Sequence, residues 1–348
     1  MNWLIQQYRK PSLLVIHVSF ITASWLFSGM HVFSRPALEH LPPYVFSVIR
    51  LMIGLPFMYL ITLKEKRVDL TWGDNGRLIM IGISGIGIAQ SVIFAANKLM
   101  GAGIVGMMLP LSTIITMLLS GILGLERIGP LKVIGAFLAV SGSIAIAWVT
   151  EKDFHADTVW GVVFMFLQTT GWSTYLIVMS QLLKSKPIPT YAYFRAAVWG
   201  LLFMLPLGAM QISDVKWSEI PYWVWLVEIY CGLVVSSGVH VAMSWLIKHC
   251  AALMPAMYTS IQPLTTVILA SLVLGERFSV WLFLCMFSIL AGLILVIIAK
   301  AKEQQQATPA CEKDVSSGNE DAREPLIPAH APTSDDEGID KAKSDTFV

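Results

Sequence analysis

Two ionisable side chains lie in the apolar stretch around residue 230, at a depth where charge is costly and usually functional. Glu228 is the only carboxylate clearly inside a predicted span, and His240 follows about three helical turns later. A carboxyl group or an imidazole at membrane depth can take up a proton from one face and release it to the other. Both residues are therefore candidates for proton coupling. A Glu that is merely hydrogen-bonded within a helix bundle would leave the same pattern.

Two arginines also fall within apolar stretches, Arg50 near the membrane side opposite the N-terminus and Arg195 near the same side as the N-terminus. Each would cost roughly 2.5–3.5 kcal/mol at the centre of a lipid-facing helix. Glu276 and Glu126 end later stretches on the matching sides. We therefore expect the pairs Arg50–Glu276 and Arg195–Glu126, which would latch an outer and an inner gate. The alternative is that both arginines snorkel to headgroups or cap helix ends.

The elements that hold these side chains are predicted to be membrane-spanning helices. Hydrophobic residues make up 55% of the 348 residues and charged residues only 14%, against about 25% charged in soluble domains. A helix needs about 20 apolar residues to cross the hydrocarbon core. Ten stretches qualify, which predicts an all-α membrane protein of ten transmembrane helices, at about 12–33, 43–63, 77–97, 101–123, 129–149, 158–183, 190–211, 220–247, 252–274 and 278–299.

Loop charges predict the orientation of these helices. With the N-terminus in the cytosol, the loops on that side carry thirteen Lys and Arg residues and the opposite loops carry five. Because positive loops stay in the cytosol, both termini are expected there, as an even number of spans requires. The protein is expected to be integral and multi-pass, in the plasma membrane or a vacuole-type membrane.

The two halves of the chain repeat one another. Gly-Leu-Glu-Arg at 124–127 returns as Leu-Gly-Glu-Arg at 274–277, Trp25 matches Trp172 at an offset of 147, and Arg50 matches Arg195 at 145. We therefore expect five-helix repeats over 1–150 and 151–302. Because five is odd, the second repeat must be inverted relative to the first. Inverted repeats with a binding site between them are a transporter architecture.

Residues 303–348 differ in composition from the membrane body. They carry 4 basic and 11 acidic residues, against 20 and 12 in residues 1–302. Such a segment cannot bury enough apolar surface to fold, so a disordered, acidic, cytosolic tail is expected. Glu-Pro-Leu-Ile at 324–327 resembles a sorting signal and the final Thr-Phe-Val resembles a PDZ ligand. A tail that only adds solubility is the simpler interpretation.

The paired Glu-Arg motifs and the glycine spacing after them resemble the EamA-type drug/metabolite transporter superfamily. The stretches at 29–38 (Gly-Met-His-Val-Phe-Ser-Arg-Pro-Ala-Leu) and 108–116 (Met-Leu-Pro-Leu-Ser-Thr-Ile-Ile-Thr) resemble its plant "walls are thin" or UMAMIT branch. The sixth helix departs from that plant pattern. The resemblance covers about residues 10–300. It implies a ten-helix transporter of amino acids, auxin-like compounds or other small organic metabolites.

By the same analogy, the first, third, fourth, sixth, eighth and ninth helices line the cavity. Aromatic walls with a few polar groups suit a small amphipathic solute. The substrate-binding candidates in these helices are Trp25, Gln90, Met108, Trp172, Tyr175, His240, Tyr258 and Gln262. Each of them could instead serve packing. The two glutamines are the most informative, because an amide facing lipid is disfavoured.

The sequence thus favours a secondary transporter that moves small organic solutes by alternating access. A nucleotide-sugar or sugar-phosphate carrier, which needs a basic cavity, and a non-transporting scaffold acting through its tail remain alternatives. No Walker A loop and no metalloprotease or hydrolase motif occurs, so an enzyme is not expected. The four cysteines lack metal-binding spacing. Expected partners are a small organic solute, the lipid bilayer and protons, with no cofactor, no metal and no nucleic acid.

Overall fold

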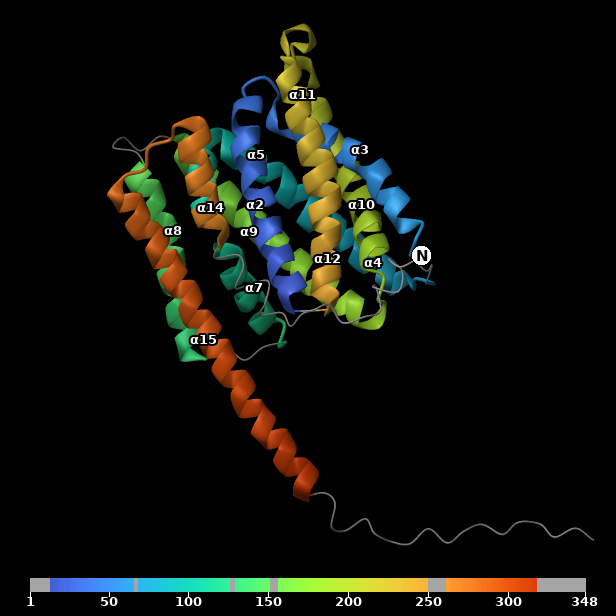
Figure 1. The fold of residues 1–348 in the computed structure, drawn as a ribbon, viewed down its shortest axis with the longest axis vertical. Coiled ribbons are helices and arrows are strands. Elements are labelled where there is room, and N and C mark those ends of the chain that lie inside the picture. Colours follow the sequence, from blue (N-terminus) through green and yellow to red (C-terminus); the bar gives the residue numbers. More distant parts are fainter. Residues whose placement is uncertain (1–12, 66–67, 126–128, 151–155, 250–260, 318–348) are drawn as a thin grey trace, which may run out of the picture. The chain divides into compact units, whose positions relative to one another are not determined.

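The computed structural model describes residues 13–65, 68–125, 129–150, 156–249 and 261–317, and every regular element in these ranges is helical. The chain forms two compact units, residues 1–301 and 302–348. The helices below belong to the first unit, except that the last one continues into the second (Figure 1).

Helices of the first half correspond to five of the predicted spans. Two of these spans are single, uninterrupted α-helices, α2 (Leu13–Ala37) and α3 (Pro43–Thr62). The third span is built from α4 (Trp72–Met80), the π-helical η1 (Ile81–Ile88) and α5 (Ala89–Met100). The fourth is divided at Pro110 into α6 (Ala102–Met108) and α7 (Leu111–Ile122), and α8 (Pro130–Thr150) follows. A proline at this point ends one helix because it cannot donate the next backbone hydrogen bond.

The second half repeats this order. It begins with α9 (Ala156–Ser185) and α10 (Pro189–Gln211), followed by the short 3₁₀ helices η2 (Ile212–Asp214) and η3 (Trp217–Glu219). Next come α11 (Tyr222–Ile229), the π-helical η4 (Tyr230–Val239) and α12 (His240–His249). The described helices end with α14 (Ile261–Leu269), the π-helical η5 (Ala270–Leu274) and α15 (Val280–Ser317).

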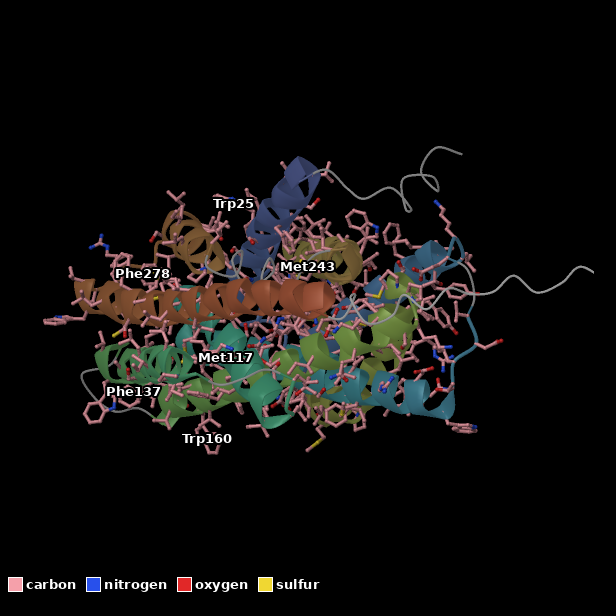
Figure 2. The ribbon with its side chains drawn as sticks, turned by 90° about the horizontal axis from the view of Figure 1, so that it is seen from below. Trp25, Met117, Phe137, Trp160, Met243 and Phe278 are labelled. Carbon is pink, nitrogen blue, oxygen red and sulfur yellow. The ribbon has the colours of Figure 1, made fainter. Side chains whose placement is uncertain are left out.

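The apolar helices define an integral, multi-pass membrane protein. Seven helical segments of the described chain are long and apolar enough to cross a bilayer, and two shorter apolar helices cover Pro130–Ile146 and Ile261–Leu274. Phe137 and Trp160 are 74% and 57% exposed, whereas Met117 is 4% exposed (Figure 2). Exposed aromatic side chains at membrane depth are expected to face lipid. The buried side chains on the opposite faces of the helices form the core of the bundle.

Several pairs of helices approach one another at glycines, among them α3 with η4 and η1 with α10. A Cβ atom on Gly232 of η4 would lie 2.5 Å from the carbonyl oxygen of Arg50 on α3, and one on Gly54 would lie 2.7 Å from the carbonyl oxygen of Gly232. Between η1 and α10, a Cβ on Gly82 would lie 2.5 Å from the carbonyl oxygen of Ala196. Backbones can come this close only where side chains are absent, so glycine determines both crossings.

Side chains at the ends of α3 and α10 cap each other's first turns. The Tyr44 N–H at the start of α3 donates to Gln211 Oε1 at 3.2 Å. The N–H groups of Thr190 and Tyr191 at the start of α10 donate to the Glu65 carboxylate at 3.3 and 2.6 Å. The first amides of a helix have no partner within it, so these side chains satisfy groups that are costly to leave open in a membrane.

The last helix corrects the prediction for the tail. We expected residues from 303 onward to lack regular structure, but α15 continues to Ser317. The added stretch begins Lys-Glu-Gln-Gln-Gln-Ala, and these residue types all have high helix propensity, so an apolar helix can extend through them. The remainder of the predicted tail, with its sorting and PDZ-like motifs, lies outside the described residues.

Candidate functional site

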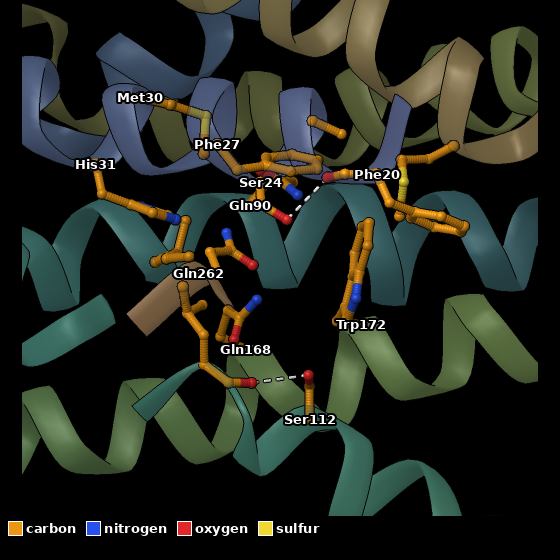
Figure 3. Close-up of a pocket in the computed structure, with 14 residues that line it drawn as sticks. Phe20, Ser24, Phe27, Met30, His31, Gln90, Ser112, Gln168, Trp172 and Gln262 are labelled. Atoms are coloured by element: carbon orange, nitrogen blue, oxygen red, sulfur yellow. Dashed lines mark hydrogen bonds between the residues drawn. The ribbon is translucent and has the colours of Figure 1, made fainter. Parts of the chain in front are cut away.

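A cavity of about 70 Å³ lies among helices from both halves of the chain (Figure 3). Its lining comes from α2, α5, α7, α9, α12 and α14, together with Leu109 between α6 and α7. Ligand pockets of roughly 300–1,000 Å³ are usual for drug-sized molecules. The cavity in this conformation is therefore narrow, and suits a small solute or a few water molecules.

The polar wall of the cavity consists of uncharged groups. Three glutamines, one histidine and two serines line it, namely Gln90, Gln168, Gln262, His31, Ser24 and Ser112. The serine hydroxyls donate to backbone carbonyl oxygens of Phe20 and Leu109, so they are already satisfied. His31 Nδ1 and Gln168 Oε1 are buried without a hydrogen-bond partner in the described chain. Buried polar atoms normally have partners, so these two are available to a bound molecule.

Aromatic and aliphatic side chains form the rest of the wall. Figure 3 places Gln168 and Gln262 between His31 on one side and Trp172 on the other. Trp172 stacks on Tyr175 with ring centroids 4.7 Å apart, which holds its indole against the cavity. The remaining apolar lining residues are Phe20, Ala23, Phe27, Met30, Ile93, Leu109 and Met243. Such a wall accepts the apolar part of an amphipathic solute.

Arg50 lies directly behind this wall. It is 1% exposed, and both terminal nitrogens donate to Gln90 Oε1 at 3.3 and 3.2 Å. One of these nitrogens also contacts Met30 Sδ at 3.4 Å, and the guanidinium carbon lies 4.9 Å from the centre of the Phe94 ring. No ion pair of Arg50 occurs in the described chain. A buried cation is thus held by one amide, one sulfur and one ring face.

Glu228 and His240 are buried close to this region but do not line the cavity. Glu228 is fully buried, and neither of its carboxyl oxygens has a hydrogen-bond partner in the described chain. His240 Nδ1 lies 2.9 Å from the Val235 carbonyl oxygen, five residues earlier in η4. The His240 ring contacts Phe27 and Trp172, at 5.0 and 5.7 Å between centroids, so it lies one layer behind the cavity wall.

The charged residues expected to form gate pairs have other partners in the structure. Arg50 contacts Gln90 and not Glu276, so the Arg50–Glu276 pair is absent from this structure. Glu276 instead accepts from the N–H groups of Ala102 and Gly103 at 3.3 and 3.1 Å. Arg195 donates to Asn75 Oδ1 at 3.2 Å and to the Tyr191 hydroxyl at 3.4 Å. Its expected partner Glu126 lies outside the described residues.

A shift of one residue explains why Arg50 and Arg195 have different surroundings. The caps and glycine crossings relate α3 to α10 by 146 residues, since Tyr44 corresponds to Thr190 and Gly54 to Gly200. The two arginines are 145 residues apart. One residue rotates a side chain by about 100° around a helix. Arg50 therefore points into the bundle, whereas Arg195 is only half-buried.

The structure brings some of the other predicted residues to the cavity. Gln90, Trp172 and Gln262 line it. Met108 and Tyr175 are fully buried outside the lining, and the Tyr175 hydroxyl lies 3.2 Å from Ser244 Oγ. Trp25 is 44% exposed and does not line the cavity, and Tyr258 lies outside the described residues. A prediction based on helix number could not separate these cases, because it ignores rotation about each helix axis.

Sequence reasoning missed several residues of the wall. His31 and Gln168 are the two with unsatisfied atoms, and Ser112, Phe27 and Met30 also line the cavity. A signal for His31 and Gln168 was present, because each is a polar residue inside an apolar stretch. The same reasoning that favoured the other two glutamines applies to them.

The Glu276 cap leads to a testable prediction. Glu276→Ala would leave the amides of Ala102 and Gly103 without acceptors, and we expect a loss of about 1–2 kcal/mol in unfolding free energy. Glu276→Gln, which keeps one acceptor oxygen, should lose less. The measurement is the unfolding of purified protein in mixed micelles. Glu39→Ala is the control, since that side chain is 69% exposed with a long 3.8 Å ion pair. Equal losses for Glu276→Ala and Glu39→Ala would contradict the prediction.

These features together define a class of protein. Several bilayer-length helices, spans broken by π-helical segments and a proline, and a partly polar cavity between them are typical of a multi-pass membrane transporter. The model of the EamA-like transporter family matches residues 14–148 and 159–298, and the chain belongs to this family. It is therefore a transporter-class protein and not an enzyme.

Known relatives agree with this assignment. Protein WALLS ARE THIN 1 of Arabidopsis thaliana is 24% identical over 335 residues, which cover 85% of this chain and 86% of that protein. An uncharacterized transporter of Clostridium kluyveri is 20% identical over 304 residues, covering 83% and 91%. The match to Protein WALLS ARE THIN 1 confirms the resemblance to the walls-are-thin branch. A solved crystal structure with a TM-score of 0.59 and 18% identity covers 84% of this chain and 99% of that chain, which supports the fold alone.

Proposed function

We propose that this protein is a secondary transporter that moves small organic solutes, such as amino acids or related metabolites, by alternating access. The observation that carries the proposal is the cavity between helices of both halves, which has apolar walls and unsatisfied polar atoms on His31 and Gln168. A solute with one polar and one apolar end would find partners for both. A non-transporting scaffold would have no use for such a cavity.

The proposed architecture is ten spans in two inverted repeats, over 1–150 and 151–302. The helix caps support it. Tyr44 N–H bonds to Gln211, and Thr190 N–H bonds to Glu65. Adding 146 to the numbers 44 and 65 gives 190 and 211, so one offset converts one cap into the other. An offset of 150 likewise converts one contact between α8 and α15 into the other, since it relates 135 to 285 and 142 to 292. A Cβ on Gly135 would lie 2.6 Å from the Gly292 carbonyl oxygen, and one on Gly142 would lie 3.0 Å from that of Cys285. Exchange of partners under one offset is expected of a two-fold axis.

Alternating access then needs one repeat to move against the other. The interfaces that such a movement uses would be those between equivalent helices, where η1 and η4 carry matching π-helical segments. π-Helical segments often occur at functional sites, because their looser backbone hydrogen bonds can rearrange. We propose that both termini face the cytosol, as the loop charges predict.

The chemistry of the wall bears on the class of solute. No Lys or Arg side chain lines the cavity in the described chain. Phosphate groups are usually bound by several direct contacts from Arg or Lys. The cavity therefore favours amino acids and similar metabolites over nucleotide sugars and sugar phosphates.

Proton coupling through Glu228 gives a direct prediction. Glu228 is fully buried with neither carboxyl oxygen bonded in the described chain, so both oxygens are free to exchange a proton with water once a movement of the helices exposes them. Glu228→Gln removes the proton-exchanging group and keeps the size of the side chain. We expect this variant to keep solute exchange at equal pH on both sides and to lose the acceleration caused by a pH gradient. Full acceleration in the variant would remove Glu228 from the coupling mechanism.

The experiment for the function itself is flux in proteoliposomes. The full chain is reconstituted, and uptake and efflux of labelled amino acids are measured with and without a pH gradient, against empty vesicles. Saturable flux above the empty vesicles is the expected result. Absence of flux for every amino acid and for a wider set of organic metabolites would contradict the proposal.

A further inference from the structure

Gln90 presents a hydrogen-bond donor to the cavity, and Arg50 determines that orientation. Arg50 has only N–H donors, so the Gln90 atom that it contacts from two nitrogens must be the amide oxygen. The amide NH₂ group therefore points away from Arg50. Gln90 lines the cavity while Arg50 does not, so the NH₂ group is the polar part of Gln90 available to a solute. It has no hydrogen-bond acceptor in the described chain.

Arg50 has no counter-charge in direct contact, and the buried Glu228 carboxyl interacts with it only over a longer distance. Arg50 is 1% exposed, and no carboxylate lies within ion-pair distance of it in the described chain. A buried cation without a paired anion is costly, and a neutral amide with a sulfur atom offsets only part of that cost. A negative group placed one amide away from the guanidinium would lower the cost. The cavity lies at that position, on the far side of Gln90.

We propose that the cavity recognises a carboxylate, which accepts hydrogen bonds from the Gln90 amide, and that Arg50 acts through Gln90 as the positioning residue and as the counter-charge. This inference rests on the proposed function and names the part of the solute that the site selects. A carboxylate held by a neutral donor with a cation behind it needs no direct Arg contact. Hydrogen bonds to a charged group are roughly twice as strong as neutral ones, so the carboxylate contributes to selectivity.

The rest of the wall indicates where the other end of the solute lies. His31 Nδ1 and Gln168 Oε1 are polar atoms without partners, and Phe27 and Trp172 give apolar surface beside them. A small solute with a carboxylate, a second polar group and an aliphatic or aromatic side chain matches all three regions. The cavity of about 70 Å³ favours a small aliphatic body in this conformation.

The test compares two probes that differ only in the carboxylate. L-Valine and isobutylamine share the same amino group and branched carbon body. Binding is measured by isothermal titration calorimetry with the full chain in lipid nanodiscs. We expect wild-type protein to bind L-valine at least about tenfold more tightly than isobutylamine, the factor that 1.4 kcal/mol represents.

Gln90→Glu is the decisive variant. Its carboxylate would still accept from Arg50, so the variant should fold, but it offers the cavity no donor and repels a second carboxylate. The preference for L-valine should fall to about twofold or less. Gln211→Glu is the matched control, because Gln211 accepts from Tyr44 N–H outside the cavity and a carboxylate can do the same. It should keep the wild-type preference.

A second variant covers the case in which Gln90→Glu does not fold. Arg50→Gln removes the charge and leaves a neutral donor for Gln90, so the preference should decrease here too. Equal binding of the two probes by wild-type protein, binding of neither, or a preference that survives in Gln90→Glu would overturn the proposal. Flux assays distinguish failure of the carboxylate inference from failure of the transport proposal. Flux of other solutes without a preference for a carboxylate rejects only the carboxylate inference. Selective binding of L-valine without any flux rejects only the transport proposal.

Discussion

Replacement of Gln90 by leucine is expected to destabilise the protein by about 3 kcal/mol, because it leaves a buried guanidinium without its acceptor. Arg50 is 1% exposed and directs two N–H groups at Gln90 Oε1. After the substitution only Met30 Sδ and the face of Phe94 would remain beside the charge. The measurement is the free energy of unfolding of the purified protein in mixed micelles.

The control is the same substitution elsewhere in the same cavity. Gln168 is 4% exposed, and its amide oxygen has no partner in the described chain. Gln168→Leu therefore takes no hydrogen-bond acceptor away from a charged group. We expect the free energy of unfolding to change by less than about 1 kcal/mol. Similar losses for Gln90→Leu and Gln168→Leu would mean that Arg50 does not depend on Gln90.

Replacement of Gly232 by leucine is expected to disrupt the contact between α3 and η4. A Cβ atom there would lie 2.5 Å from the Arg50 carbonyl oxygen and 3.0 Å from Ile53 Cβ. Because the first of these is a backbone atom, no side-chain rotation relieves the clash and the helices must separate. We expect a loss of about 3 kcal/mol or more, or failure to fold, together with loss of flux.

Gly238→Leu in the same π-helical segment is the matched control. A Cβ atom at Gly238 would have its nearest contact at 3.8 Å, to the Leu233 carbonyl oxygen, which is ordinary packing distance. This variant should fold and transport like the wild type. If Gly232→Leu melts at the same temperature as Gly238→Leu, the two helices do not depend on their glycine contact.

The hydropathy pattern alone was sufficient to predict a multi-pass membrane protein. A helix in lipid must satisfy its own backbone groups and present about 20 apolar residues, so bilayer-length spans can be recognised from local sequence. The span pattern, the recurring Glu-Arg motifs and the glycine spacing after them together indicated the family, which the match over residues 14–148 and 159–298 confirms. Gln90, Trp172 and Gln262 were recognised as cavity residues because polar or aromatic groups in apolar stretches are informative.

The choice of partners depended on tertiary structure. Charge complementarity suggested Glu276 for Arg50, but Arg50 meets Gln90, and Glu276 caps α6. Which side chains meet depends on the rotation of each helix about its axis and on its close approach to a neighbour. A single residue changes the rotation by about 100°, and the approach is set by glycines 146 or 150 residues apart in the two halves. Local sequence therefore determined that the chain crosses the membrane several times, and packing between distant segments determined which charged groups meet.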